Sequence, residues 1–272
     1  MTSPETVAPP AKEEGSFTAF LIKLTLIVLI VRSFVASPFN IPSQSMLPRL
    51  MIGDYLIVAK WPYGFTHYSI PFSPPLWDGR IFGRLPERGD VVVFKAPPTQ
   101  KQDYIKRVIG LPGDLIQMSK GQLQINGVPV PKKRIADFVE PLTPNSACKG
   151  ADVSKFREKA SDGSERCRYP RYEETLPNGK RYAVLDLGPI PQDNTEVLSV
   201  PEGYVFVMGD NRDRSADSRF PAVEGQGVGI VPVENIVGRA WFTIFSTDGS
   251  AEWLKPWTWF SAARWKRIGE GF

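Results

Sequence analysis

The sequence predicts a mostly-β protein attached to one N-terminal membrane-spanning helix. Its 272 residues include 26 prolines and 23 glycines, and this abundance of turn formers favours many short strands over long helices. β-branched clusters such as Val91-Val92-Val93-Phe94 are typical of such strands. One long apolar run, Phe17 to Ala36, stands near the N-terminus. With 42 % hydrophobic residues, the rest of the chain can form a substantial core.

The formal net charge of +4 is mild for this length and suits contact with an anionic phospholipid membrane better than binding to nucleic acid. No basic stripe with interleaved aromatic residues is present, so no nucleic-acid partner is expected. Two cysteines, Cys148 and Cys167, and one histidine, His67, are too few for a typical zinc centre. We therefore expect no metal and no other cofactor.

Residues 1–16 are polar and predict a disordered tail. The apolar run 17–36 would form a helix about 30 Å long, enough to cross a bilayer. Lys23 and Arg32 can extend their charged ends toward the headgroups. We expect a single transmembrane helix, with an interfacial helix as the second interpretation. A cleaved signal peptide is disfavoured, because the tail is not basic. Cleavage after Ser37 would put Pro38 just past the cleaved bond, and cleavage after Ala36 would leave bulky Phe34 where a small residue is needed.

Two serines follow the anchor directly, in the stretch Ile41-Pro42-Ser43-Gln44-Ser45-Met46-Leu47-Pro48. The flanking prolines favour an extended, rigid segment, in which side chains two residues apart point the same way. Ser43 and Ser45 could therefore direct their hydroxyls at one substrate atom, with Ser45 as a nucleophile. On these residues alone, a simple linker between helix and domain is an equally good interpretation.

Further strands are expected along the chain, separated by glycine- and proline-rich turns. Residues 61–86 should form an irregular loop, and Asn126-Gly127 the tight turn of a hairpin. The predicted hairpin is Leu123–Val130, and the predicted strands are Asp54–Val58, Val91–Phe94, Tyr104–Ile109, Tyr182–Leu187, Tyr204–Met208, Val228–Val231 and Ile236–Phe245.

The chain divides into a core in two parts, 37–130 and 200–247, around a charged, turn-rich insertion at 131–199. The insertion contains both cysteines, which form a disulfide if the domain lies outside the cytoplasm, or stay two unrelated thiols if it does not. The segment 248–272 is rich in tryptophan and arginine. It either lies in the membrane interface, or Trp253, Trp257 and Phe260 cap the core of the domain.

A serine nucleophile needs a base, and the usual partner is histidine. Only His67 exists, in an aromatic, proline-rich loop that does not fix its position. The alternative is a lysine, which must be buried to lose about 2–3 pH units of its pKa at a cost of about 3–4 kcal/mol. Lys106 qualifies, because on a strand it shares a face with Tyr104 and Val108. A lysine protecting a strand edge from aggregation is an equally good interpretation of Lys106.

Five stretches resemble the successive sequence boxes of type I signal peptidase, the bacterial leader peptidase. They are Pro42–Pro48, Gly53-Asp54, Arg88-Gly89-Asp90-Val91-Val92-Val93-Phe94, Tyr104 to Asp114 and Gly209 to Arg219. The boxes occur in the right order and cover the anchor and nearly all predicted core strands. The resemblance implies a membrane-anchored, β-barrel-like catalytic domain with an inserted β-rich subdomain.

By position, the family's nucleophile falls on Ser45 and its general base on Lys106. The oxyanion hole would combine the backbone N–H of Ser45 with the hydroxyl of Ser43. Ser215 matches the serine that orients the lysine by a hydrogen bond. The resemblance also assigns supporting roles to Asp210, Asp217 and Arg219.

The family's shallow pockets for small side chains, typically alanine, fall on a set of mostly apolar positions. Three residues depart from the family pattern, Gln44, Arg49 and Arg214, which puts substrate contacts in doubt and leaves the chemistry intact. The pocket positions are Phe39, Ile41, Leu50, Val93, Tyr104 and Ile105.

The implied reaction is removal of signal peptides from preproteins after Ala-x-Ala, with signal peptides and the phospholipid membrane as partners. The resemblance places the catalytic domain on the periplasmic or external face of the inner membrane, and it favours the Cys148–Cys167 disulfide. A self-cleaving repressor would need a DNA-binding module where this chain has an anchor. A membrane-tethered, non-catalytic β-module that binds signal sequences or partner proteins is the alternative, but it has no need of a deprotonated lysine.

Overall fold

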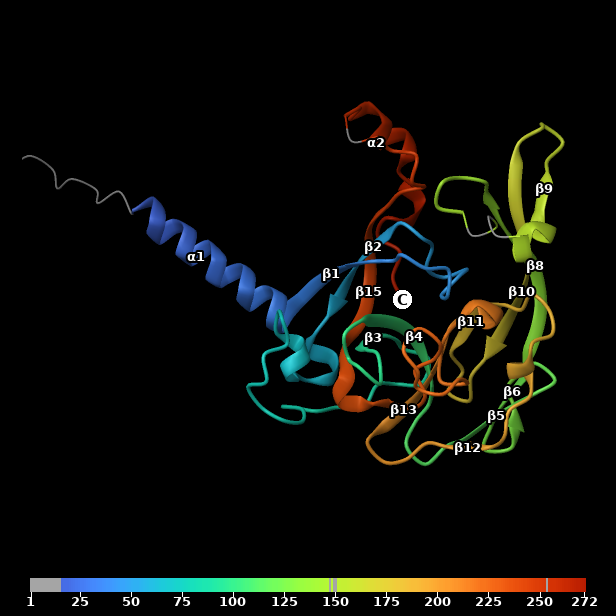
Figure 1. The fold of residues 1–272 in the computed structure, drawn as a ribbon, viewed down its shortest axis with the longest axis horizontal. Coiled ribbons are helices and arrows are strands. Elements are labelled where there is room, and N and C mark those ends of the chain that lie inside the picture. The colour runs from blue at the N-terminus through green and yellow to red at the C-terminus, as the bar shows by residue number, and fades with distance from the viewer. Residues whose placement is uncertain (1–15, 147, 149–150, 253) are drawn as a thin grey trace, which may run out of the picture.

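The computed structural model describes residues 16–146, 148, 151–252 and 254–272 (Figure 1). The tail predicted to be disordered lies outside the described residues except for Ser16, and so does Trp253. The expectation of a mostly-β fold is confirmed, because nearly all regular structure after the first helix is strand.

The largest sheet has seven strands and curls into a half-barrel. Every pairing in it is antiparallel. In spatial order its strands are β1 (Ala36–Asn40), β2 (Asp54–Ala59), β15 (Ile236–Ser246), β3 (Val91–Lys95), β4 (Asp103–Gly110), β13 (Tyr204–Met208) and β14 (Val231–Pro232).

Strand β3 is covered on both faces. Val92 and Phe94 pack in one apolar cluster with Val108, whereas Val91 and Val93 pack in another on the opposite face. Successive side chains of a strand point to opposite faces, so a continuous apolar run is what a strand buried on both sides requires. The expected strands of this sheet are present, although β14 is shorter than predicted.

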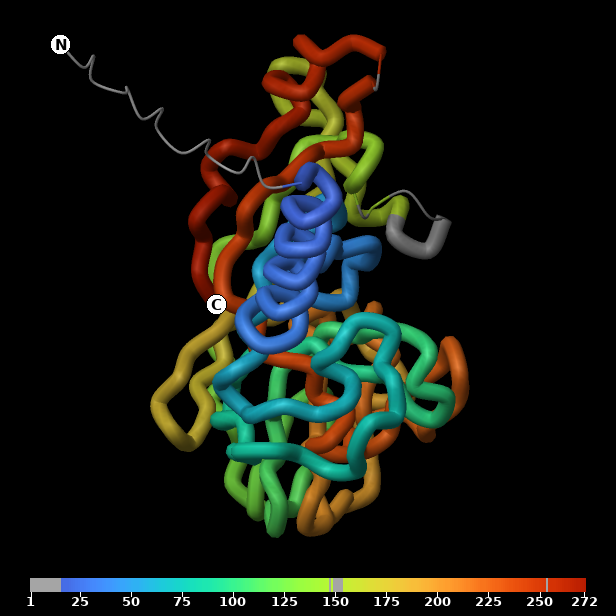
Figure 2. The backbone as a smooth tube through the Cα atoms, turned by 90° about the vertical axis from the view of Figure 1, so that its left-hand side faces the viewer, coloured from blue at the N-terminus to red at the C-terminus, as the bar shows by residue number. Residues whose placement is uncertain are grey.

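The N-terminal apolar run is helical, with α1 spanning Phe17–Ile30 and a π-helical turn spanning Val31–Val35. Together they make 19 residues with a mean hydropathy of 2.1, long and apolar enough to cross a membrane. The helix projects away from the domain (Figures 1 and 2). It stops one residue before the predicted end, because Ala36 already opens β1 and Pro38 disfavours helix in the residue before it.

Two smaller sheets complete the domain. One runs in the order β12 (Leu198–Ser199), β5 (Leu115–Ser119), β6 (Gln122–Ile125), β7 (Val128–Pro129), and its hairpin has positive φ angles of 54° at Asn126 and 75° at Gly127. The other lies at the end of the molecule opposite α1 (Figure 1). It consists of β11 (Arg181–Leu185), β10 (Glu165–Thr175), β8 (Lys132–Pro141) and β9 (Arg157–Lys159).

A disulfide joins Cys148 to Cys167, whose Cα atoms lie 5.9 Å apart. Cys167 belongs to β10, and Cys148 lies in the loop between β8 and β9. Both are buried, in a cluster with Tyr169 and Leu185. The cross-link therefore ties the loop to the sheet of the insertion.

The C-terminal segment returns along β15 and contains α2 (Trp257–Ala262). Trp257 is 68 % exposed and Phe260 is 72 % exposed, so these two aromatic residues do not cap the core. The contacts with the domain include Arg267, whose guanidinium lies 2.6 Å from the buried carboxylate of Asp54, and Phe272, which packs against an apolar core cluster.

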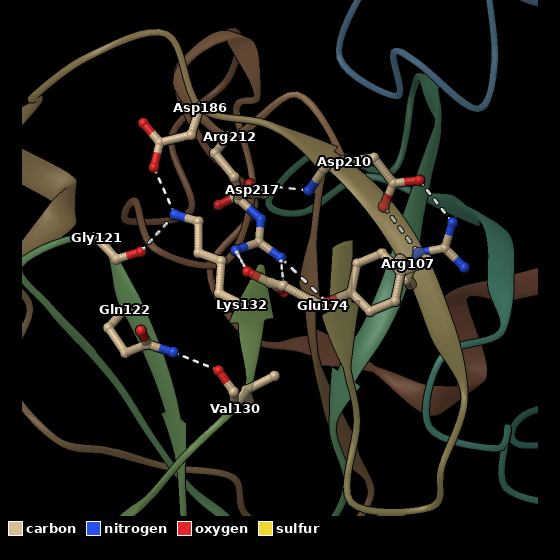
Figure 3. A network of polar contacts seen from close by, with 12 residues as sticks. Arg107, Gly121, Gln122, Val130, Lys132, Glu174, Asp186, Asp210, Arg212 and Asp217 are labelled. Atoms are coloured by element: carbon tan, nitrogen blue, oxygen red, sulfur yellow. Dashed lines mark hydrogen bonds and ion pairs between the residues drawn. The ribbon is translucent and has the colours of Figure 1, made fainter. Parts of the chain in front are cut away.

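Two buried ion pairs connect the insertion and the core to the loop that follows β13 (Figure 3). Arg212, in this loop, bonds Glu174 of β10 through both guanidinium Nη atoms, at 2.7 and 2.6 Å. The Tyr182 hydroxyl donates to the same carboxylate at 2.7 Å. Arg107 of β4 bonds Asp210 at 2.8 and 2.6 Å. The loop is thus clamped from two sides.

Replacing Glu174 with glutamine should destabilise the fold strongly. Arg212 would keep its charge in a site where its side chain is 3 % exposed, and breaking a buried pair on one side typically costs about 3–5 kcal/mol. The midpoint of urea unfolding of the detergent-solubilised chain measures the change. Glu165→Gln is the matched control, because its pair with Arg157 is exposed and should matter little. Equal midpoints for the two variants would contradict this account of the clamp.

Candidate active site

Ser45 and Lys106 meet inside the domain although they come from different segments. The Lys106 ammonium nitrogen, Nζ, donates to Ser45 Oγ at 2.8 Å and to the carbonyl oxygen of Ile105 at 3.0 Å. Ser45 is 6 % exposed and Lys106 is 3 % exposed. A lysine that protects a strand edge would reach solvent, so that interpretation of Lys106 does not fit.

The serine stretch is not extended as predicted. After Ser43 the chain bends into turns, with the N–H of Leu47 bonded to the carbonyl of Gln44 at 3.1 Å. The loop after β13 holds this conformation. The backbone N–H of Asn211 donates to the Ser45 carbonyl at 3.1 Å, and its side-chain amide donates to the Gln44 carbonyl at 3.1 Å. Sequence reasoning missed Asn211, whose only signal was its place beside Asp210.

The two serine hydroxyls lie together despite the bend, with 3.3 Å between Ser43 Oγ and Ser45 Oγ. The backbone N–H of Ser45 makes no hydrogen bond to any described residue. The Ser45 N–H is therefore free, and the Ser43 hydroxyl can turn from Ser45 Oγ, so that both can donate to a negatively charged oxygen atom.

Burial lowers the pKa of Lys106 to about 8 from its usual 10.5, while the charges of Asp217 and Asp210 oppose the shift. Each of these carboxylates is bound to an arginine. Asp210 pairs with Arg107, and Asp217 pairs with Arg219 at 2.9 Å, with both side chains inaccessible to solvent. No carboxylate among the described residues lies within ion-pair distance of Lys106, so nothing compensates fully for its desolvation.

Asp217 stays ionised beside the lysine. Burial raises the pKa of its carboxyl, but the charge and hydrogen bonds of Arg219 outweigh burial, so that the pKa lies below the usual value. Its carboxylate also accepts the N–H of Gly209 at 3.0 Å. Gly209 has no room for a side chain, because a Cβ would lie 2.2 Å from Ser215 Oγ and 2.5 Å from the Ser45 carbonyl oxygen.

Ser215 is buried against Gly209, and its hydroxyl, beside the Asp217 carboxylate, helps to lower the pKa of that carboxyl. The expected bond from Ser215 to Lys106 is not formed. Lys106 Nζ instead bonds Ser45 and the Ile105 carbonyl, and Ser215 contributes its bulk behind Gly209.

A cavity of about 320 Å³ opens beside the Ser45–Lys106 pair. Five of the six predicted pocket residues line it, and Leu50 does not. Leu50 is fully buried beneath the pocket, in the cluster with Ile41 and Val93. The lining residues are Phe39, Asn40, Ile41, Pro42, Ser43, Ser45, Val93, Gln102, Asp103, Tyr104, Ile105, Lys106, Arg214 and Ala216.

His67 lies apart from this arrangement. Its ring packs on Tyr68 with 3.9 Å between the ring centroids, and no described interaction joins it to Ser45. Within the described part of the chain, no group of three or more histidine, cysteine, aspartate or glutamate side chains is placed to hold a metal ion.

The arrangement can support acyl transfer in chemical terms. It combines a hydroxyl, a desolvated amine in hydrogen-bond contact with it, and free donors beside the hydroxyl oxygen, next to a largely apolar cleft. These are the parts that a serine hydrolase with a lysine base needs.

Comparison with known proteins identifies the family of the chain. The model of the family described as signal peptidase, peptidase S26, matches residues 15–245. Signal peptidase I of Rickettsia conorii is 37 % identical over an alignment of 246 residues, which covers 87 % of this chain and 80 % of the relative. Signal peptidase I of Rickettsia prowazekii is 38 % identical over 245 residues, with the same coverage. The crystal structure of a signal peptidase I from Enterococcus faecalis V583 is 28 % identical and covers 57 % of this chain and 97 % of its own, with a TM-score of 0.29.

The family match extends over most of the chain, and the Rickettsia proteins are similar along nearly nine-tenths of it. The resemblance seen in the sequence boxes is therefore confirmed, and the chain belongs to the signal peptidase family, peptidase S26, whose members are hydrolases.

Proposed function

We propose that this protein is a membrane-bound serine endopeptidase that removes signal peptides from preproteins, with Ser45 as nucleophile and Lys106 as general base. Membership of the signal peptidase family supports signal-peptide removal. The observation that carries the assignment of residues is the 2.8 Å hydrogen bond between Lys106 Nζ and Ser45 Oγ, which joins two almost fully buried side chains.

The reaction follows from this geometry. Neutral Lys106 accepts the proton of Ser45 Oγ as that oxygen forms a bond to the scissile carbonyl carbon. The negative charge then on the carbonyl oxygen is stabilised by the Ser45 N–H and the Ser43 hydroxyl. The Lys106 ammonium returns the proton to the leaving amine as the C–N bond breaks. Water, deprotonated by the same lysine, then hydrolyses the ester and frees Ser45.

The cleft suits an extended peptide with small side chains. Strand β13 pairs with β4 only from Arg107 onward, so the stretch Asp103–Lys106 has β3 on one side and the cavity on the other. A substrate strand can bond to this free edge. Side chains two apart would then point into the cleft together, which favours Ala-x-Ala before the cleaved bond.

The anchor and the C-terminal segment would both hold the domain at a membrane. Helix α1 has the length and composition of a spanning segment, and family members are membrane-anchored. Trp257, Trp259 and Phe260 are exposed near the C-terminus, where indole rings suit the lipid–water interface. We place the catalytic domain on the external, periplasmic face, where signal peptides emerge.

Ser45→Ala and Lys106→Ala should each abolish cleavage, because one removes the attacking oxygen and the other its base. The measurement is cleavage of a preprotein bearing Ala-x-Ala by the detergent-solubilised chain, followed by gel electrophoresis. Lys133→Ala is the control, since Lys133 is an exposed lysine of β8. Cleavage near the wild-type rate by Lys106→Ala would exclude the proposed base.

The kcat/KM of the enzyme should depend on pH through Lys106. Its pKa is lowered to about 8, and only the neutral amine accepts the serine proton. The rate should therefore rise about tenfold per pH unit below this pKa and level off above it. Lys60 also has a pKa lowered to about 8 by burial, so Lys60→Met is the control and should keep the inflection. A profile without an inflection near pH 8 would refute this role of Lys106.

Ser43→Ala should impair catalysis without abolishing it. The variant loses one oxyanion donor and keeps the Ser45 N–H, and such a loss typically lowers kcat by about 10²–10³-fold. Steady-state kinetics on the same preprotein measures the change, with Ser43→Thr as a control that keeps a hydroxyl. An unchanged kcat for Ser43→Ala would contradict an oxyanion role.

A further inference from the structure

A second cavity, of about 180 Å³, lies where the anchor helix meets the domain. It is separate from the Ser45–Lys106 pair, although Phe39 and Asp103 line both cavities. The loops of residues 61–85 surround this end of α1 (Figures 1 and 2). Three basic side chains line the cavity, Arg32, Lys60 and Lys95, together with the single carboxylate of Asp103.

The charges in this cavity are unbalanced. Lys95 pairs with Asp103 at 3.0 Å, so the one carboxylate of the cavity already has a basic partner. Lys60 is 3 % exposed and has no ion-pair partner among the described residues. Burying an unpaired ammonium is costly, and burial lowers the pKa of Lys60 to about 8, with Asp103 raising it and Lys95 and Arg32 lowering it. An anion in the cavity would relieve this cost.

The hydrogen-bonding groups of the cavity suit an oxygen-rich anion. The hydroxyls of Ser69 and Ser73 line it beside the basic groups. The ring of Phe39, which also lines the cavity, has its centroid 6.0 Å from Lys60 Nζ. A phosphate group can accept hydrogen bonds from an ammonium, a guanidinium and hydroxyls at once.

The cavity is fixed relative to the end of the anchor. The Lys60 N–H donates to the Val35 carbonyl at 3.0 Å, and Ser37 Oγ donates to the Arg32 carbonyl at 2.9 Å. The ring of Phe34 packs edge-on against Phe65 with 5.3 Å between centroids. Helix and cavity therefore keep one geometry, and the end of a spanning helix lies at the level of the lipid headgroups.

The rim of the cavity is apolar. Phe72 is fully exposed at 101 % and stands in a turn with a positive φ of 67°. Ile70 and Pro71 precede it in the lining. An exposed ring beside a basic cavity, next to a helix that would span the bilayer, matches the order of acyl chain and phosphate in a phospholipid.

We propose that this cavity binds the phosphate of an anionic phospholipid headgroup, with Lys60 and Arg32 as its basic ligands and Phe72 against the acyl chains. The proposal rests on the membrane-spanning role proposed for α1. It concerns a lipid site rather than the peptidase chemistry, because neither Lys60 nor Arg32 lines the cavity beside Ser45 and Lys106.

Native mass spectrometry of the full chain in detergent, titrated with dioleoylphosphatidylglycerol, tests the site. The wild type should bind the lipid, and Lys60→Met should weaken binding roughly tenfold or more, as expected for the loss of one charged hydrogen bond. Arg32→Gln should weaken it too, and Lys60→Arg should retain it. Lys133→Met is the matched control for the change in net charge and should bind as the wild type does.

Equal affinity of the wild type, Lys60→Met and Arg32→Gln would overturn the proposal. Displacement of the lipid by equimolar inorganic phosphate would also overturn the proposal, because the cavity would then be a site for free anions. Displacement by a synthetic signal peptide would overturn it by assigning the cavity to the substrate. Lys60→Met should cleave the preprotein as the wild type does. A wild type that binds lipid but cleaves nothing would refute the proposed function and leave the lipid site standing.

Discussion

The burial of Lys106 beside Ser45 is the constraint on which the rest of the structure depends. Lowering a lysine pKa from 10.5 to about 8 corresponds to roughly 3 kcal/mol of lost preference for the charged form. The low pKa of Lys106 persists because each nearby carboxylate is paired with an arginine, Asp210 with Arg107 and Asp217 with Arg219. Lys106 thus remains without an ion-pair partner in the described chain, and its neutral form is accessible near physiological pH.

The loop after β13 links this site to the inserted sheet. Asn211 holds the backbone around Ser45 through two hydrogen bonds, and the adjacent Arg212 is bound to Glu174 of β10. Ser45, the proposed nucleophile, is therefore held by a segment that is itself fixed by the insertion. This chain of contacts connects the insertion physically to the proposed site, although none of its described residues lines the cleft.

The family and most core strands were predictable because local patterns determine them. Strand alternation singled out Lys106 as the base candidate, and the structure buries this lysine beside Ser45. Contacts between distant segments were not predictable. Asn211 bends the Ser45 segment from far along the chain. The end of the helix was also hard to predict, because β1 continues directly from it with no break in composition. Leu50 lies beneath the cleft rather than in its wall, and Ser215 packs behind Gly209 without bonding the lysine. In each case tertiary packing decides the position.

Direct titration of Lys106 tests the central claim most sharply. Nuclear magnetic resonance of lysine labelled with ¹³C at Cε, in the full chain in detergent, follows each ammonium through its ionisation, and Lys106→Met identifies the Lys106 signal. The account predicts a pKa of about 8 for that signal, against about 10.4 for solvent-exposed lysines. Titration of Lys106 together with the exposed lysines would contradict it, since the amine would then be almost wholly protonated when the enzyme needs a base.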